Sequence, residues 1–240
     1  MPLLQRAIRG GEAVTRETSI GWAQTTWNPA TGCNRHCEYC YAREMHHRFK
    51  DVWGYDFQPT FHPDRLRLPY TWKKPRIVFV CSMGELFDLP MDQVEKVLTV
   101  CSENPKHRFL LLSKREDMLR HYSYPGNVWL GVTVTGAIDE HRIKALLDTD
   151  AHIKFISFEP LLDSTSEDLD LHGVDWVIIG GRRKVVWPDP IPKFVPPRCW
   201  VTPLIEKARE AGCAVFLKDN LEWPETVREW PIDLAGDLNE

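Results

Sequence analysis

Alternation between short apolar runs and amphipathic segments limits the possible folds of this chain more than any other feature. Six runs rich in β-branched and aromatic residues are expected to form buried strands, at 76–81, 108–113, 128–135, 152–158, 174–180 and 214–218. An additional first strand is expected around 22–27. Segments with helical spacing lie between the strands, at 91–104, 138–147 and 202–211. Because alternating strands and helices favour parallel strands joined by right-handed crossovers, the sequence predicts an α/β fold.

A parallel sheet of this kind either curls into a barrel or half-barrel or stays open as a doubly wound sheet, and we favour the barrel. The chain has 240 residues, a length at which such barrels commonly form one domain. We therefore expect a single domain over residues 1–240. Within it, 1–18 is expected to be an N-terminal extension, and 221–240 is a C-terminal tail to which the sequence assigns no structure.

Composition and charge restrict the environment and the partners. No apolar run approaches the ~20 residues that cross a bilayer, and residues 1–16 lack the pattern of a cleaved signal, so we expect a cytoplasmic protein without membrane contact. A formal charge of −4 disfavours a wholly basic surface but permits a local basic patch for nucleic acid. Seven cysteines without a secretion signal are expected to be mostly reduced thiols.

Three of these cysteines, Cys33, Cys37 and Cys40, lie within eight residues at the spacing C-x3-C-x2-C. Three thiolates from one short loop can bind three irons of a [4Fe-4S] cluster and leave the fourth iron open to another ligand. An open iron indicates catalysis. The alternative is a zinc site completed by His36, His46 or a remote ligand, since three thiolates and one imidazole satisfy tetrahedral zinc.

This spacing, with an aromatic residue just before the last cysteine, resembles the signature of the radical S-adenosylmethionine enzymes. The resemblance implies that Cys33, Cys37 and Cys40 are the catalytic metal ligands and that the open iron chelates S-adenosyl-L-methionine. One electron then splits this cofactor into methionine and a 5′-deoxyadenosyl radical, which abstracts hydrogen from the substrate. Tyr39 matches the position that lies against the adenine, and its alternative role is to pack the loop onto the barrel.

The residues that follow the strand at 76–81 also match the superfamily. Ser82, Met83, Gly84 and Glu85 resemble its Gly-Gly-Glu motif, whose backbone and carboxylate hold the ammonium group of the cofactor, although only one of the two glycines is present. The resemblance implies a cofactor-binding role for these four residues. The alternative for Glu85 is a carboxylate that caps a helix.

Polar and charged side chains follow the other predicted strands, at the end where parallel barrels place their chemistry. The further candidates for cofactor binding are Lys114, Thr133, Thr135, Glu159 and Lys218. The two lysines offer cations to a carboxylate or phosphate, and the threonines lie near where the fourth strand of the superfamily contacts ribose and carboxylate. Glu159 follows a strongly apolar strand, where a charge needs a partner or a ligand. Each of these residues also has an ordinary structural interpretation.

Over nearly the whole chain, the pattern resembles a little-characterised family of radical enzymes found in phages and prokaryotes. The motifs that carry the likeness include Thr31-Gly32-Cys33, Phe158-Glu159-Pro160 and Phe216-Leu217-Lys218. The likeness implies a partial (β/α)6-type barrel of parallel strands with a cluster-binding loop after the first strand, but it supplies no reaction. Residues 181–183 read Gly-Arg-Arg, a departure from the family pattern that leaves the substrate side open.

Three functions are compatible with these observations. The leading one is a radical enzyme that acts on a nucleic acid base, a nucleotide or a similarly anionic substrate, because cations follow several strands. The second moves the same chemistry to a peptide or small metabolite, which the net charge of −4 favours. The third is a non-catalytic zinc or iron–sulfur module that binds a partner. A radical enzyme also implies an electron donor such as flavodoxin or ferredoxin.

Overall fold

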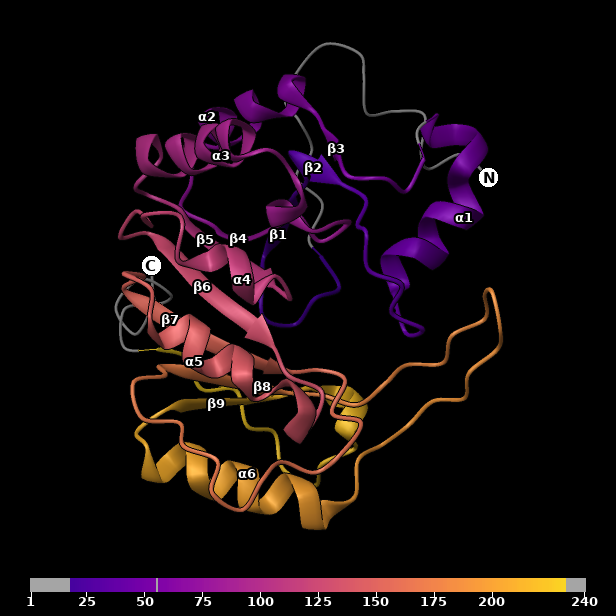
Figure 1. Ribbon diagram of the computed structural model, residues 1–240, viewed down its shortest axis with the longest axis vertical. Helices are drawn as coiled ribbons and strands as arrows, with labels where there is room; N and C mark the ends of the chain where they lie inside the picture. The colour runs from indigo at the N-terminus through magenta and orange to yellow at the C-terminus, as the bar shows by residue number, and fades with distance from the viewer. Residues whose placement is uncertain (1–17, 55, 232–240) are drawn as a thin grey trace.

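The computed structural model describes residues 18–54 and 56–231. These residues contain one seven-stranded sheet in which all neighbouring strands are parallel. The strands, in their order across the sheet, are β1 (Thr25–Trp27), β4 (Ile77–Val80), β5 (Arg108–Ser113), β6 (Val128–Thr133), β7 (Ile153–Phe158), β8 (Trp176–Ile179) and β9 (Ala214–Leu217). Because this order follows the chain without reversal, the sheet is wound as a barrel and not as a doubly wound sheet. It curls into a half-barrel, which confirms the expected fold class (Figure 1).

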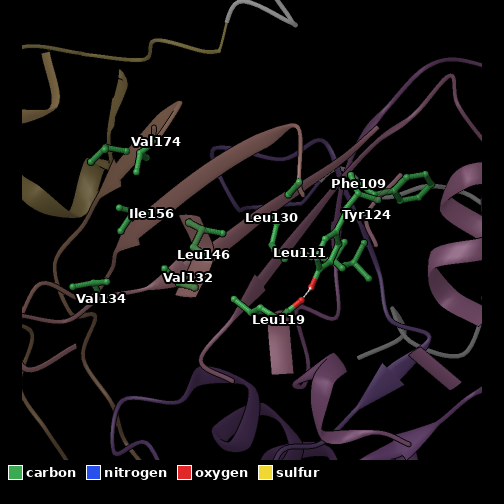
Figure 2. Close-up of a cluster of buried hydrophobic side chains, with 14 of the residues drawn as sticks. Phe109, Leu111, Leu119, Tyr124, Leu130, Val132, Val134, Leu146, Ile156 and Val174 are labelled. Atoms are coloured by element: carbon green, nitrogen blue, oxygen red, sulfur yellow. Dashed lines mark hydrogen bonds between the residues drawn. The ribbon is translucent and has the colours of Figure 1, made fainter. Parts of the chain in front are cut away.

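The two faces of the sheet have separate apolar cores, because alternate residues of a strand point to opposite sides. In β7, Ile156 belongs to the outer core, which includes the helices, and Phe155 belongs to the inner core, which consists mainly of strand residues. Figure 2 shows part of the outer core, where Ile156 and Leu146 both lie. The long helices of the outer core are α3 (Met91–Glu103), α5 (His141–Leu147) and α6 (Arg198–Glu210). Burying one helical face against the sheet leaves the inner face and the strand ends for function.

The helix α3 agrees with the sequence prediction, and α5 and α6 differ from theirs at their beginnings. The helix expected from 138 is split into a 3-10 turn η3 (Ala137–Asp139) and the shorter α5. The helix expected from 202 begins at Arg198. Pro197 precedes it, and the Pro197 carbonyl accepts a hydrogen bond from the N–H of Val201 at 3.3 Å. The irregular, proline-rich segment therefore ends at Pro197, and α6 begins directly after it. Proline is common at the N-terminus of a helix.

The beginning of the C-terminal tail completes the inner core. The carbonyl of Val227 accepts from the N–H of Leu217, so the tail runs antiparallel along the free edge of β9. The Trp230 ring then lies 4.9 Å from the Trp176 ring, stacked inside the half-barrel. Pairing of this kind protects the edge of a sheet from other chains. Residues 232–240 and all but Thr18 of the expected N-terminal extension lie outside the described residues.

Several elements were not expected from the sequence. The helix α1 (Tyr41–Trp53) follows the three cysteines directly, and β2 (Ala30–Thr31) pairs antiparallel with β3 (Thr60–Phe61). The others are η1 (Pro63–Arg67), α2 (Leu68–Thr71), η2 (Leu86–Asp88), α4 (Glu116–Leu119) and η4 (Asp219–Leu221). Within residues 18–54 and 56–231, no helix combines the length and apolar character that crossing a membrane requires.

Candidate functional site

The cysteine loop (residues 32–40) connects β2 to α1 and begins at a glycine that is held on two sides. The N–H of Gly32 donates to the carbonyl of Met83 at 2.9 Å, and the carbonyl of Gly32 accepts from the N–H of Glu85 at 3.0 Å. On the other side, a Cβ at Gly32 would lie 2.0 Å from the carbonyl oxygen of Gln58. Its φ of +81° also belongs to the left-handed region that glycine adopts without strain. Only glycine fits at this position.

The segment 82–85 lies directly against the cysteine loop, where it follows β4. A Cβ at Gly84 would lie 2.6 Å from the carbonyl oxygen of Gly32, so the one glycine of this segment stands at the point of closest approach. The carbonyl of Ser82 accepts from the hydroxyl of Tyr41, the first residue of α1. Both ends of the cysteine loop are therefore fixed to the carboxyl end of β4.

The three thiols of the loop are free, and each cysteine is half-buried. Backbone N–H groups point at two of the sulfurs, from Arg35 to Cys33 Sγ at 3.3 Å and from Arg43 to Cys40 Sγ at 3.4 Å. Cys40 is also the N-cap of α1, where the helix dipole favours negative charge. Hydrogen bonds to sulfur and a positive helix end both stabilise thiolates that bind metal.

Burial of the cysteine loop opposes ionisation of the Cys33 thiol. Burial raises the pKa of the Cys33 thiol to about 12, against the opposing N–H of Arg35, so its thiolate needs a cation beside it. In the described part of the chain, no three His, Cys, Asp or Glu side chains converge closely enough to hold one metal ion. A cubane cluster requires a wider arrangement, because each thiolate binds a different iron.

The histidines considered as zinc ligands lie in different surroundings. His36 is an exposed residue of the cysteine loop, and His46 is a buried residue of α1. The His46 ring lies 5.4 Å from the ring of Phe57.

Two of the predicted cofactor residues lie close together, Tyr39 in the cysteine loop and Lys114 directly after β5. The Lys114 ammonium is 5.7 Å from the centre of the Tyr39 ring. Burial and the neighbouring Cys37 thiol, which shares a hydrogen bond with the phenol, raise the pKa of Tyr39. Tyr39 therefore stays neutral at physiological pH, with its phenol beside Cys37.

Glu85 is buried and ties the ends of two strands together. Its Oε1 accepts from the hydroxyl of Ser113 at 2.8 Å and from the N–H of Phe87 at 3.4 Å, and its Oε2 accepts from the N–H of Lys114 at 3.1 Å. Burial raises the pKa of this carboxyl. The helix-capping role is thus observed at η2, and any cofactor ammonium group would share oxygens that the protein already occupies.

We expect Glu85→Ala to lower the free energy of unfolding by about 1–3 kcal/mol, because it leaves the buried donors of Ser113 and Lys114 unpaired. Chemical denaturation measures this change. Glu95→Ala, which removes an exposed carboxylate from α3, is the control and should change stability by less than about 0.5 kcal/mol. Glu85→Gln should keep most of the stability and still weaken S-adenosylmethionine binding by about 1–3 kcal/mol if the charge holds the cofactor. Unchanged affinity in Glu85→Gln would restrict this carboxylate to its structural contacts.

The two predicted threonines lie at the end of β6 and differ in their contacts. Thr133 is buried in the strand, and its carbonyl accepts from the guanidinium of Arg142 at 2.9 Å. Thr135 lies beyond the strand, and its N–H and hydroxyl both donate to Asp139 Oδ2, at 3.0 and 2.7 Å. The Thr135 hydroxyl therefore helps to shape the loop after β6.

The two remaining candidates, Glu159 and Lys218, form an ion pair with each other. They follow β7 and β9, which are not neighbours, and β8 lies between these strands and is followed by Gly180. A Cβ at Gly180 would lie 3.0 Å from Cγ of Glu159, so glycine makes room for the pair. The side chains of Glu159 and Lys218 are only 21% and 22% exposed. A carboxylate at this depth needs a partner, and that partner is Lys218.

The segment between β8 and α6 (residues 180–197, hereafter the arm) reaches the helix that follows the cysteines. Two contacts join them: Arg183 pairs with Glu44 of α1, and the Trp187 ring stacks on the His47 ring at 3.9 Å. Figure 1 shows α1 and the arm on the same side of the sheet. The arm carries four of the cations of the chain and a single acid, Asp189.

A series of charged side chains that the sequence analysis did not identify connects the cysteine loop to β6. The Arg35 guanidinium lies 3.7 Å from Glu116 of α4, Glu116 accepts from Arg142 of α5 at 3.3 Å, and Arg142 pairs with Asp139 at 2.8 Å. In the sequence these residues are four charges from three separate segments, and such charges are usually solvated. Only their convergence in the fold distinguishes them.

Comparison with known proteins gives one family and one group of structures. The model of a family described as a protein of unknown function, DUF5131, matches residues 17–234. No curated protein matches the chain. A solved spore photoproduct lyase with one cysteine replaced by serine is similar at 12% identity and a TM-score of 0.54, over 88% of this chain and 81% of that chain. Spore photoproduct lyase complexed with dinucleoside spore photoproduct is similar at 12% identity and a TM-score of 0.52, over 85% of this chain and 79% of that chain. At these identities the likeness shows the fold alone, a parallel sheet curled into a half-barrel.

Proposed function

The chain belongs to the DUF5131 family of proteins of unknown function, and on that premise we propose that it is a radical S-adenosylmethionine enzyme. One observation carries the proposal: three half-buried thiols in one loop are fixed to the carboxyl end of a half-barrel by the contact of Gly32 with Gly84. The same fold occurs in spore photoproduct lyase, a radical S-adenosylmethionine enzyme, which supports the assignment to the superfamily.

In this proposal, Cys33, Cys37 and Cys40 hold a [4Fe-4S] cluster, with S-adenosylmethionine beside it. When bound, this pair supplies a one-electron cleavage of the sulfonium that leads to hydrogen abstraction from substrate. Backbone N–H groups stabilise the sulfur charge, and Tyr39 offers a neutral ring to the adenine. The Glu159–Lys218 pair keeps the neighbouring strand ends electrically balanced. A small electron-transfer protein such as flavodoxin or ferredoxin would supply the electron.

Release of 5′-deoxyadenosine tests this function. Anaerobically reconstituted chain, reduced with dithionite and given S-adenosylmethionine, should produce 5′-deoxyadenosine, and the same mixture without reductant should not. If several reductants of different potential yield no product from protein that carries iron, the radical enzyme is the wrong assignment and a binding module takes its place.

For the substrate we propose a nucleic acid base or nucleotide. The arm supports this proposal, because its cations Arg182, Arg183, Lys184 and Lys193 would attract phosphate. Spore photoproduct lyase, which has a similar fold, has been solved in complex with a dinucleoside spore photoproduct, a ligand of that protein. A peptide or small metabolite is the second candidate, which the net charge of −4 favours.

We expect binding of single-stranded oligonucleotides to weaken steeply as salt rises, because phosphate contacts release counterions. Lys184→Ala, which removes an exposed cation of the arm, should reduce the slope of log affinity against log salt by about 1. Lys73→Ala removes an exposed cation before β4, at the opposite end of the sheet, and should leave the slope unchanged. Fluorescence anisotropy measures both variants. Salt-independent binding, or equal slopes in all three proteins, would favour the peptide or metabolite.

A further inference from the structure

The turn between Cys33 and Cys37 is held by side chains from two other elements. Asp88, the last residue of η2, accepts the N–H of Asn34 on Oδ2 at 2.9 Å. Its other oxygen, Oδ1, pairs with the guanidinium of Arg115. The Asp88 side chain is only 1% exposed. A buried carboxylate with both oxygens engaged fixes the groups that it binds.

Arg43 holds the same turn from the other side. Its guanidinium donates to the carbonyl of Cys33 at 3.0 Å and to the carbonyl of Arg35 at 2.7 Å. The guanidinium carbon also lies 4.6 Å above the Phe57 ring, whose own backbone carbonyl accepts the N–H of Cys33 at 3.1 Å. Arg43 is therefore positioned by packing as well as by hydrogen bonds.

These side chains and the backbone of Phe57 together bind the polar groups of the turn. Two successive residues, Cys33 and Asn34, have their N–H groups bound, and the carbonyls of Cys33 and Arg35 share one donor. Backbone polar groups that are satisfied in this way keep a loop in one conformation. All of these partners are protein groups.

We propose that Asp88 and Arg43 are positioning residues that hold the cysteine loop in the conformation that accepts and retains the iron–sulfur cluster. This inference rests on the proposed function. It assigns to Asp88 and Arg43 a task distinct from metal ligation. Supporting residues of this kind are commonly needed for metal affinity, and their loss typically costs 10-fold to 100-fold, on the order of the effect expected here.

The rate at which a chelator removes the cluster, followed anaerobically by its absorbance, tests the proposal. Asp88→Ala should lose its cluster about 10-fold faster than the wild type. Asp88→Asn should be intermediate, since its amide oxygen can still accept the N–H of Asn34. Asp117→Ala is the matched control, because Asp117 also pairs with Arg115 but its side chain is 57% exposed. It should lose its cluster at the wild-type rate.

Arg43→Lys provides a second variant that does not depend on the folding of Asp88→Ala. It keeps the charge but has a shorter reach and loses the planar guanidinium that packs 4.6 Å above the Phe57 ring, so it should also lose its cluster faster than the wild type. Wild-type loss rates in folded Asp88→Asn and Arg43→Lys would overturn the positioning role. A wild type that takes up no iron would instead reject the proposed function, so the two failures are distinguishable.

Discussion

Cys37→Ala is expected to reduce bound iron from about four per chain to less than about one, and to abolish release of 5′-deoxyadenosine. Only three thiolates are available from the cysteine loop, and a cubane that keeps one iron open for the cofactor cannot lose another ligand. Cys37 is chosen because its sulfur contacts Tyr39, so the substitution also removes the phenol's partner. Iron analysis after anaerobic reconstitution measures the first effect, and chromatography of the nucleoside product measures the second.

Cys199→Ala is the control for this experiment. Cys199 is an exposed thiol in the first turn of α6, and it is expected to contribute no ligand. The variant should keep the iron content and the activity of the wild type. Full iron content in Cys37→Ala would show that the cluster, or another iron centre, is bound elsewhere in the chain.

Gly32→Ala is expected to lower the free energy of unfolding by at least about 3 kcal/mol and to impair iron uptake. The new Cβ would meet the carbonyl oxygen of Gln58 at 2.0 Å, and on the opposite side the backbone is bonded to Met83 and Glu85. Because backbone atoms lie on both sides, the loop can relieve the clash only by leaving the carboxyl end of β4. Chemical denaturation and iron analysis of the same preparation measure the two effects.

Gly54→Ala separates the clash from the backbone strain. Gly54 has a φ of +66°, similar to the +81° of Gly32, but a Cβ at Gly54 would meet no atom within 4 Å. In this control the free energy of unfolding should fall only by the strain of an alanine in the left-handed region, about 1–2 kcal/mol. Equal losses in Gly32→Ala and Gly54→Ala would mean that the loop moves freely away from Gln58.

Much of the barrel could be predicted from the sequence, because buried parallel strands are continuous apolar runs. The strand β5 was predicted with its observed bounds, and the other strands end within one or two residues of their predicted ends. The two-residue strands β2 and β3 were not predicted, since such short segments have no periodicity to read. The position of Trp230 could not be predicted either, because the tail pairs with β9 through backbone groups that leave no sequence pattern.

Contacts in the site could be predicted from the sequence only between segments that follow neighbouring strands of the sheet. The ends of β1 and β4 are neighbours in a barrel, so contact between the cysteine loop and the segment 82–85 follows from the fold. The pairing of Glu159 with Lys218 spans two strands that are not adjacent and depends on the curvature of the sheet. The bond from Asn34 to Asp88 depends on one side-chain direction in a three-residue turn. Neither contact can therefore be predicted from the composition or the spacing of the sequence.

Metal analysis of the anaerobically reconstituted wild-type chain tests the central claim most directly. If Cys33, Cys37 and Cys40 hold a cubane cluster, the protein should contain about four irons and as many acid-labile sulfides per chain, with no stoichiometric zinc. One zinc per chain with no retained iron would contradict the account, because a saturated zinc site provides no open iron for S-adenosylmethionine.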